Sequence, residues 1–233
     1  MLSIRRAAER GRTTRDWLDS RHTFSFGDYV DRGHSGFRAL RVINEDRVVP
    51  GGGFAEHGHR DMEIVTYVIA GALAHKDSLG NGSVIRPGDV QRMSAGLGIR
   101  HSEFNPSDSE PVHFLQLWIV PGELGLTASY EQRAFAPDAK ANRFCLIASQ
   151  DGREDSVVVH HDAAIFAATV APDAIVGHAL APGRFGWLQV VSGAIDVNGQ
   201  RLSVGDGAGI SQEKTLRLRS LSGTSEVLLF DLA

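Results

Sequence analysis

Short apolar runs separated by turn residues recur along the whole chain, and they predict strands. Residues 62–69 are rich in β-branched and aromatic side chains and end at Gly71, as a buried strand does. Residues 113–120 alternate, so that Phe114, Gln116 and Trp118 share one face of a strand. Further runs of this kind lie at 37–43, 144–148, 157–159, 165–170, 187–191, 193–197, 216–218 and 227–232. The pattern therefore predicts an all-β protein.

Two connecting segments add to this picture. Residues 72–75 and 83–85 flank Asn81-Gly82, a strong signal for a tight turn, and they predict a hairpin. Residues 123–142 contain few apolar side chains, and we interpret them as the crossover between two halves. Gln116 and Trp118 would line a pocket inside a barrel or form a satisfied pair in its core, and the sequence leaves both interpretations open.

The composition narrows the class of protein. A chain of 233 residues can bury the core of one large all-β domain or of two small ones. Its 24 basic and 28 acidic side chains nearly balance, which argues against a nucleic-acid partner. The single cysteine, Cys145, excludes an internal disulfide and fits a reducing compartment.

The first residues do not read as a targeting sequence. Residues 1–21 are polar and arginine-rich, without the apolar run that a secretory signal needs. Glu9, Asp16 and Asp19 disfavour an organelle-targeting peptide, which is poor in acidic residues. No stretch approaches the ~20 apolar residues that span a bilayer. We therefore expect a cytoplasmic protein with no membrane partner.

Two pairs of polar side chains carry the candidate chemistry. His57 and His59 point to one face of an extended strand, and so do His101 and Glu103. Neighbouring strands are ~5 Å apart, so three imidazoles and a carboxylate can converge on one ion if the two strands pair. A His-x-His pair alone is also common on solvated loops, and here the flanking turns and strands favour metal. The pairs predict a mononuclear metal site inside a small β-barrel.

The residues around these pairs resemble the two cupin motifs. Ser94 stands where proline is usual in the second motif, and four residues instead of two precede His101. Five segments resemble the pirin family of bicupins more narrowly: 40–46, 57–63, 77–81, 91–96 and 115–118. The positions that match the cupin motifs are Gly51, His57, His59 and Glu63 for the first, and Gly88, Ser94, Gly96, His101 and Asn105 for the second.

The resemblance implies two jelly-roll barrels in one chain. We expect an N-terminal cupin barrel with the metal site at residues 1–135 and a C-terminal cupin-like barrel at 136–233. In the second half, residues 180–193 and 202–207 take the places of the motifs but lack the ligand pairs. We therefore expect the C-terminal barrel to hold no metal and to support the first.

The resemblance also implies the ligands. Pirins use the residues that match His57, His59, His101 and Glu103, whereas the general cupin motif would use the match to Glu63. We place Glu63 behind the ligands, where it orients an imidazole. Pirin relatives imply Fe(II), although the donor types alone also suit Ni, Cu, Mn, Co or Zn. Four protein ligands leave positions open for water, substrate and O2.

Several pirins act as quercetin 2,3-dioxygenases. The resemblance thus implies an oxidoreductase that opens a flavonol, a small planar aromatic substrate, with O2, and Glu103 is the candidate general base. An alternative is an iron-dependent redox-sensing regulatory protein that binds a protein partner, and a third is a cupin isomerase or a metal-free sugar-binding module. We expect no direct contact with nucleic acid. We also expect a monomer, because two barrels in one chain can replace the dimer of single-barrel cupins.

Overall fold

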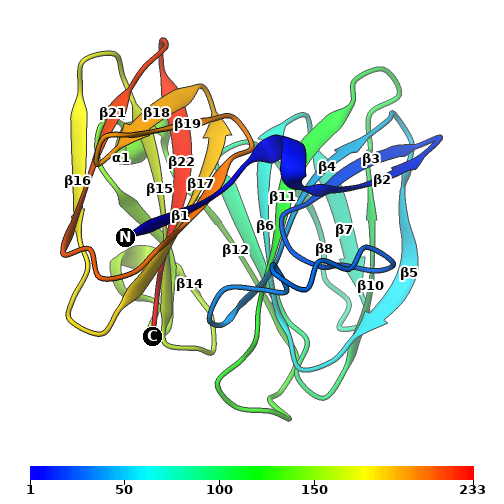
Figure 1. Cartoon of the computed structure of the whole chain (residues 1–233). Coiled ribbons are helices and arrows are strands. Elements are labelled where there is room, and N and C mark those ends of the chain that lie inside the picture. Colours follow the sequence, from blue (N-terminus) through cyan, green and yellow to red (C-terminus); the bar gives the residue numbers. More distant parts are fainter. The chain divides into compact units, whose positions relative to one another are not determined.

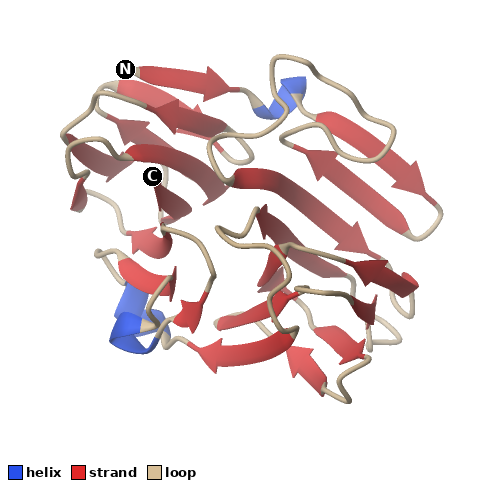
Figure 2. Cartoon of the chain, turned by 90° about the horizontal axis from the view of Figure 1, so that it is seen from below, coloured by secondary structure: helices blue, strands red, loops and turns tan.

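The computed structural model describes all residues, 1–233, and its regular structure is almost entirely β-strand (Figures 1 and 2). The all-β prediction is confirmed. The chain forms two compact units. The N-terminal unit comprises Gly11–Ala134 and Val157–His161, and the C-terminal unit comprises Met1–Arg10, Phe135–Ser156 and Asp162–Ala233.

The N-terminal unit contains two antiparallel sheets. The larger sheet runs in the order β12-β9-β6-β11-β4-β3-β2, and the smaller runs β5-β10-β7-β8. The predicted hairpin is confirmed as β7 and β8, which pair from Leu73 opposite Ile85. The strands are β2 (Gly11–Arg15), β3 (Leu18–His22), β4 (Leu40–Val48), β5 (Gly53–His59), β6 (Glu63–Ala70), β7 (Leu73–Asp77), β8 (Gly82–Ile85), β9 (Asp89–Ser94), β10 (Ile99–Phe104), β11 (Val112–Ile119), β12 (Ser129–Ala134) and β14 (Val157–Val158).

A polar layer separates two apolar clusters inside this unit. Along β6, Ile64 belongs to one cluster and Val68 to the other, and Thr66 lies between them on the same face. Along β11, Gln116 lies in the same way between Phe114 and Trp118. Thr66 and Gln116 are buried. Because buried polar groups need partners, this layer is where a bound group is expected.

The smaller sheet brings the two ligand pairs together. His101 on β10 lies opposite His57 on β5, so the two ligand pairs lie on paired strands. The register shifts after this pair, so that Glu103 lies opposite Phe54. At the shift β5 approaches β10 closely, because a Cβ on Gly53 would lie 2.3 Å from the backbone oxygen of Glu103. Position 53 on β5, beside Glu103, therefore has no room for a side chain and requires glycine.

The C-terminal unit repeats the two-sheet plan. One sheet contains the order β1-β20-β17-β22-β15-β13, and the other runs β16-β21-β18-β19. In β21, buried and exposed residues alternate as the period of a strand demands. Its elements are β1 (Leu2–Arg5), η1 (Ala7–Glu9), α1 (Pro137–Lys140), β13 (Cys145–Ser149), η2 (Arg153–Asp155), β15 (Ala163–Val170), β16 (Ile175–Ala179), β17 (Phe185–Ser192), β18 (Ala194–Val197), β19 (Gln200–Ser203), β20 (Gly207–Ile210), β21 (Thr215–Ser220) and β22 (Ser225–Leu232).

Some elements were not visible in the hydrophobic pattern. The polar segment 123–142 contains strand β12, which pairs with β9 from Ser129 opposite Ser94. The polar first residues form β1, which pairs with β20 of the C-terminal unit (blue in Figure 1). β12 depends on hydrogen bonds to its neighbouring strand, whereas β1 also packs Leu2 and Ile4 against the apolar core of the C-terminal unit. None of the helices has the length and apolar character needed to span a bilayer.

Candidate metal centre

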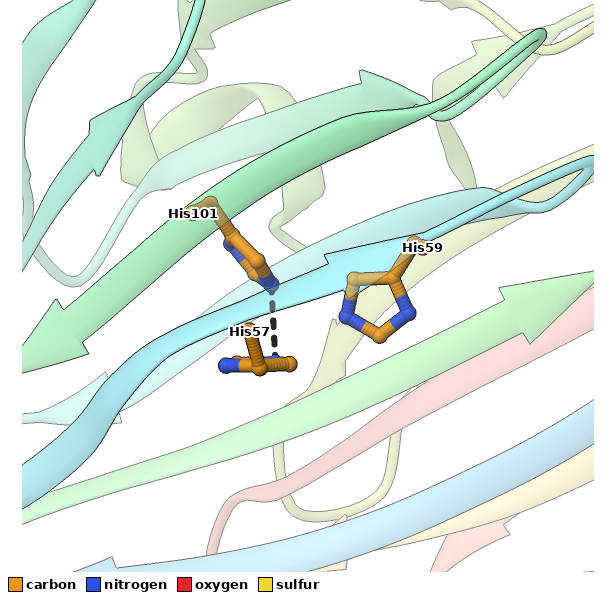
Figure 3. A group of neighbouring side chains, drawn as sticks. All are labelled: His57, His59 and His101. Carbon is orange, nitrogen blue, oxygen red and sulfur yellow. Dashed lines mark hydrogen bonds between the residues drawn. The ribbon is translucent and has the colours of Figure 1, made fainter.

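Three imidazoles from two neighbouring strands converge in the N-terminal unit. The rings of His57 and His59 on β5 and of His101 on β10 point toward one another (Figure 3). Each offers a ring nitrogen, and the three nitrogens lie within 4.8 Å of one another. Nε2 of His57 and Nε2 of His101 are 3.1 Å apart. We call these three residues the imidazole cluster.

The proton position on His57 follows from its surroundings. Its Nδ1 lies 2.8 Å from the carbonyl oxygen of Ala55. A carbonyl oxygen only accepts hydrogen bonds, so Nδ1 carries the proton and donates it. In the neutral ring, Nε2 then carries no proton, and its lone pair faces His101. Metal-binding histidines are commonly held by such a bond from the other ring nitrogen.

The other two rings are held neutral. Burial lowers the pKa of His101 to about 2, and the neighbouring His57 and His59 act in the same direction. Burial lowers the pKa of His59 to about 4, and His57 contributes again. Because a metal ligand must be deprotonated, both rings are ready to bind a cation at neutral pH without first losing a proton.

Glu103 is buried, with 1% of its surface exposed. Its Oε2 accepts a hydrogen bond of 2.8 Å from Nε2 of Gln116, while its Oε1 has no partner. Burial raises the pKa of Glu103 to about 7, and Asp46 adds to the rise, although the bond from Gln116 opposes it. The carboxyl oxygen lies within 4.8 Å of ring nitrogens of His75 and His101.

Aromatic side chains border the imidazole cluster. The ring of Trp118 meets the ring of His59 edge to face, with centroids 4.9 Å apart, and Phe26 packs on Trp118 in the same way at 5.3 Å. Nε1 of Trp118 donates to Oε1 of Gln116 at 3.1 Å. Gln116 and Trp118, which share a face as predicted, therefore link Glu103 to the aromatic border.

Glu63 occupies a different place. It is 1% exposed, and its Oε2 accepts hydrogen bonds from Oγ of Ser94 at 2.8 Å and from the backbone nitrogen of His160 at 3.2 Å. Nδ1 of His160 lies 3.1 Å from the same oxygen. Glu63 belongs neither to the imidazole cluster nor to the group formed by His75, His101 and Glu103. The imidazole that it orients is that of His160.

Two further residues beside the cluster were not singled out from the sequence. His75 on β7 lies opposite Glu103, and Asp77 lies opposite His101. They form a His-x-Asp pair that shares one face of a strand, which is a signal of the same kind as the two predicted pairs. Only the pairing of β7 with β10 reveals that this face is the one that the ligand pairs occupy.

The residues fit a divalent cation. Imidazole nitrogens and a carboxyl group with an unpartnered oxygen are donors that transition metals accept in proteins. Unpaired buried polar atoms are costly, so the free oxygen of Glu103 is an atom that a cation could satisfy. The arrangement lacks the thiolates of a structural zinc site, so it suits a centre with open positions.

Comparison with known proteins agrees with this fold. The family model described as Pirin matches residues 4–119, and the model described as Quercetinase C-terminal cupin domain matches residues 146–232. The chain is 47% identical over 232 residues to a quercetin 2,3-dioxygenase of Escherichia coli K12, covering 100% of this chain and 99% of the relative. It is 43% identical over 234 residues to a putative quercetin 2,3-dioxygenase of Mycobacterium tuberculosis, covering 99% and 95%.

Solved structures also resemble this chain over most of its length. The bacterial pirin YhhW from Escherichia coli in complex with nickel(II) matches with a TM-score of 0.94 and 46% identity, covering 100% of this chain and 99% of that chain. A quercetin 2,3-dioxygenase from Acinetobacter baumannii matches with a TM-score of 0.77 at 22% identity, covering 98% and 85%, and this likeness concerns the fold alone.

The fold and the imidazole cluster define the chain as a bicupin, a protein with two cupin domains and a candidate metal centre in the first. Within that class, the full-length identity to its relatives shows that the chain belongs to the pirin family. The expectations of two cupin domains and of pirin membership are confirmed.

Proposed function

We propose that this pirin is a metal-dependent dioxygenase that opens the ring of a flavonol such as quercetin with O2. The observation that carries the proposal is the convergence of His57, His59 and His101 beside the buried Glu103. The full-length relatives named quercetin 2,3-dioxygenases, which are oxidoreductases, support the type of reaction. In this proposal His57, His59, His101 and Glu103 hold one divalent cation.

When bound, the cation would supply a positive charge that lowers the pKa of the substrate's hydroxyl group and stabilises its anion. The protein's own side chains would move the proton of the substrate. Glu103 would accept the proton of the substrate's hydroxyl group on Oε1, its oxygen without a protein partner, once that oxygen loosens from the cation. Gln116 holds the other oxygen, so that Oε1 keeps its direction.

A planar aromatic substrate fits the surroundings of the cluster. Trp118 and Phe26 offer ring faces beside His59, and both are partly exposed. An open depression that His59 lines also includes Arg100, whose Nε is ion-paired with Oε1 of Glu56 at 2.8 Å. The rings of Trp118 and Phe26 are therefore the groups that favour a planar aromatic substrate.

We propose Fe(II) as the native cation. The family resemblance implies iron, and the relative solved with nickel(II) supports a divalent cation without selecting one. Affinity alone does not decide, because a site of imidazoles and a carboxylate binds Ni(II) and Cu(II) more strongly than Fe(II). Metal supply in the cell then determines which ion is bound.

The first test is oxygen-dependent loss of quercetin absorbance by protein loaded with Fe(II) under anaerobic conditions, with Ni(II)-loaded protein measured in parallel. The matched variants are His101→Ala, which removes a proposed ligand, and His113→Ala, which removes a histidine that bonds to Glu45 outside the cluster. We expect turnover by wild type and His113→Ala and its loss in His101→Ala.

A second outcome would redirect the assignment. If wild type binds one cation per chain through the cluster and yet turns over no flavonol with either metal, the dioxygenase proposal is wrong. The regulatory alternative would then be tested by asking whether a partner protein binds differently to the Fe(II) and Fe(III) forms.

A further inference from the structure

His75 is a buried histidine that the proposed reaction does not use. The side chains of His75 and Asp77 are both 0% exposed. Nε2 of His75 lies 3.1 Å from Oδ2 of Asp77, while its Nδ1 has no partner. Tyr130 stacks on the ring with centroids 5.0 Å apart, and His101 packs against it at 5.3 Å. The ring is therefore fixed in place with one nitrogen left unsatisfied.

The proton of His75 can be placed from its hydrogen bond. Oδ2 of Asp77 lies 3.1 Å from Nε2 of His75 and also accepts from Nδ2 of Asn81 at 3.0 Å. Oδ1 of Asp77 accepts from the backbone nitrogens of Leu79 at 2.9 Å and Asn81 at 3.1 Å. Because both oxygens of Asp77 act as acceptors, Nε2 of His75 carries the proton and donates it. In the neutral ring, Nδ1 then carries no proton and can accept a hydrogen bond.

His101 has a buried ring nitrogen, Nδ1, that can donate a hydrogen bond to His75. Its Nε2 faces Nε2 of His57, on the side where the proposed cation is bound, and its Nδ1 is buried without a partner. A neutral imidazole that binds a cation through Nε2 carries its proton on Nδ1. The unpartnered Nδ1 of His101 is then a donor, and the unpartnered Nδ1 of His75 is an acceptor. The two residues offer ring nitrogens within 4.8 Å of each other.

We propose that His75 is a positioning residue for the metal centre, which accepts a hydrogen bond from Nδ1 of His101 and is itself oriented by Asp77. The inference rests on the proposed metal site. It gives a partner to each of two buried nitrogens that otherwise have none, because a cation held by Nε2 of His101 would fix the proton on Nδ1, which can then donate to His75. Asp77, His75 and His101 would form a row in which each residue orients the next.

The direct test uses the wild-type protein loaded with Zn(II), which is diamagnetic, after labelling the histidine rings with ¹⁵N. We expect the His101 ring to carry its proton on Nδ1 and to show a scalar coupling across the hydrogen bond to Nδ1 of His75. Zn(II)-loaded protein in which His101 binds the cation but shows no such coupling would overturn the inference.

Variants provide the second readout. His75→Leu should weaken Zn(II) binding about 10- to 100-fold in competition with a chelator, the range for loss of a residue behind a metal ligand. His75→Gln should retain most of the affinity, because its amide can accept from His101 and donate to Asp77. His113→Leu removes a histidine that also bonds to a carboxylate, Glu45, and should bind Zn(II) as wild type does. Equal affinity of His75→Leu and wild type would contradict the proposal.

The metal site and the inference fail in different ways. If His57→Ala binds Zn(II) as tightly as wild type, the imidazole cluster is not the metal site and the proposed function loses its basis. If His57→Ala loses binding while His75→Leu does not, the metal site stands and only the role of His75 is wrong.

Discussion

His57 faces His101 with a lone pair, because its other ring nitrogen donates to the carbonyl oxygen of Ala55 at 2.8 Å. The two Nε2 atoms are 3.1 Å apart, so a cation between them would replace a weak contact with two ligand bonds. This relationship links metal binding to the stability of the N-terminal unit.

Removal of metal should therefore lower the thermal stability. A cation that binds only the folded protein adds about 2.7 kcal/mol when its free concentration is 100 times the dissociation constant. We expect a chelator to lower the melting temperature of metal-loaded wild type and to have no effect on His101→Ala. Calorimetry with and without chelator checks this, and an equal shift in both proteins would contradict it.

The two buried glutamates should respond differently to substitution. Glu63 is bonded to Ser94 and His160, whereas Glu103 has an unpartnered oxygen beside His101. Glu63→Gln should lower the free energy of unfolding by about 1–3 kcal/mol through its buried hydrogen bonds and leave the metal content at one per chain. Glu103→Gln should weaken metal binding. Metal analysis and denaturant unfolding measure both effects, and metal loss in Glu63→Gln alone would reverse the assignment.

Gln116 should matter to the metal although it is not a ligand. Its side chain donates to Oε2 of Glu103 and accepts from Trp118. Gln116→Leu leaves Glu103 free to rotate, so metal affinity should fall about 10- to 100-fold. Gln132→Leu is the matched control, because Gln132 bonds to Tyr130 and Asp89 instead. Competition with a chelator gives the affinities, and equal values for Gln116→Leu and wild type would show that Glu103 needs no such support.

Two glycines of β5 should differ in their tolerance of alanine. A Cβ on Gly53 would lie 2.3 Å from the backbone oxygen of Glu103, whereas a Cβ on Gly58 would have its nearest neighbour, the backbone oxygen of Ile99, at 3.7 Å. Gly53→Ala should cost about 1–3 kcal/mol of unfolding free energy, as overpacking does. Gly58→Ala should be close to neutral. Urea unfolding of both variants measures the two losses of unfolding free energy. Equal losses in Gly53→Ala and Gly58→Ala would contradict the prediction.

Acid should destabilise the C-terminal unit through Asp231. Burial alone would raise the pKa of Asp231, but hydrogen bonds from His178 and Arg184 outweigh it and lower the pKa below its ordinary value. A lowered folded-state pKa contributes stability that is present above the ordinary value of 3.8 and is lost as pH falls through the folded-state value.

Asp231→Asn should therefore reduce the loss of stability below about pH 4, while lowering stability at pH 7 by about 1–3 kcal/mol, because bonds to a charged group are removed. Unfolding free energies measured between pH 2 and pH 7 test this, with the exposed Asp173→Asn as the control. An unchanged acid profile in Asp231→Asn would show that other groups cause the loss.

The alternation of side chains along a strand determined much of this protein from its sequence. His57 with His59, and His101 with Glu103, share a face because the period of a strand is two residues, and this holds whatever the tertiary structure. The same period placed Gln116 and Trp118 on one face. Apolar runs marked β6, β11, β17 and β22 because buried strands are built from such residues.

Only the tertiary structure decided which strands become neighbours. The pairing of β10 with both β5 and β7 brings His75 and Asp77 beside Glu103 and His101, although β7 carries no cupin ligand pair. The polar strand β12 forms because β9 supplies its hydrogen bonds, and the short strand β1 forms because it pairs with β20 and packs Leu2 and Ile4 on the C-terminal core. Glu63 meets His160, 97 positions along the chain. Local sequence encodes the face of each side chain, but contacts between distant segments depend on the register and order of strands, which hydrogen bonds and packing set together.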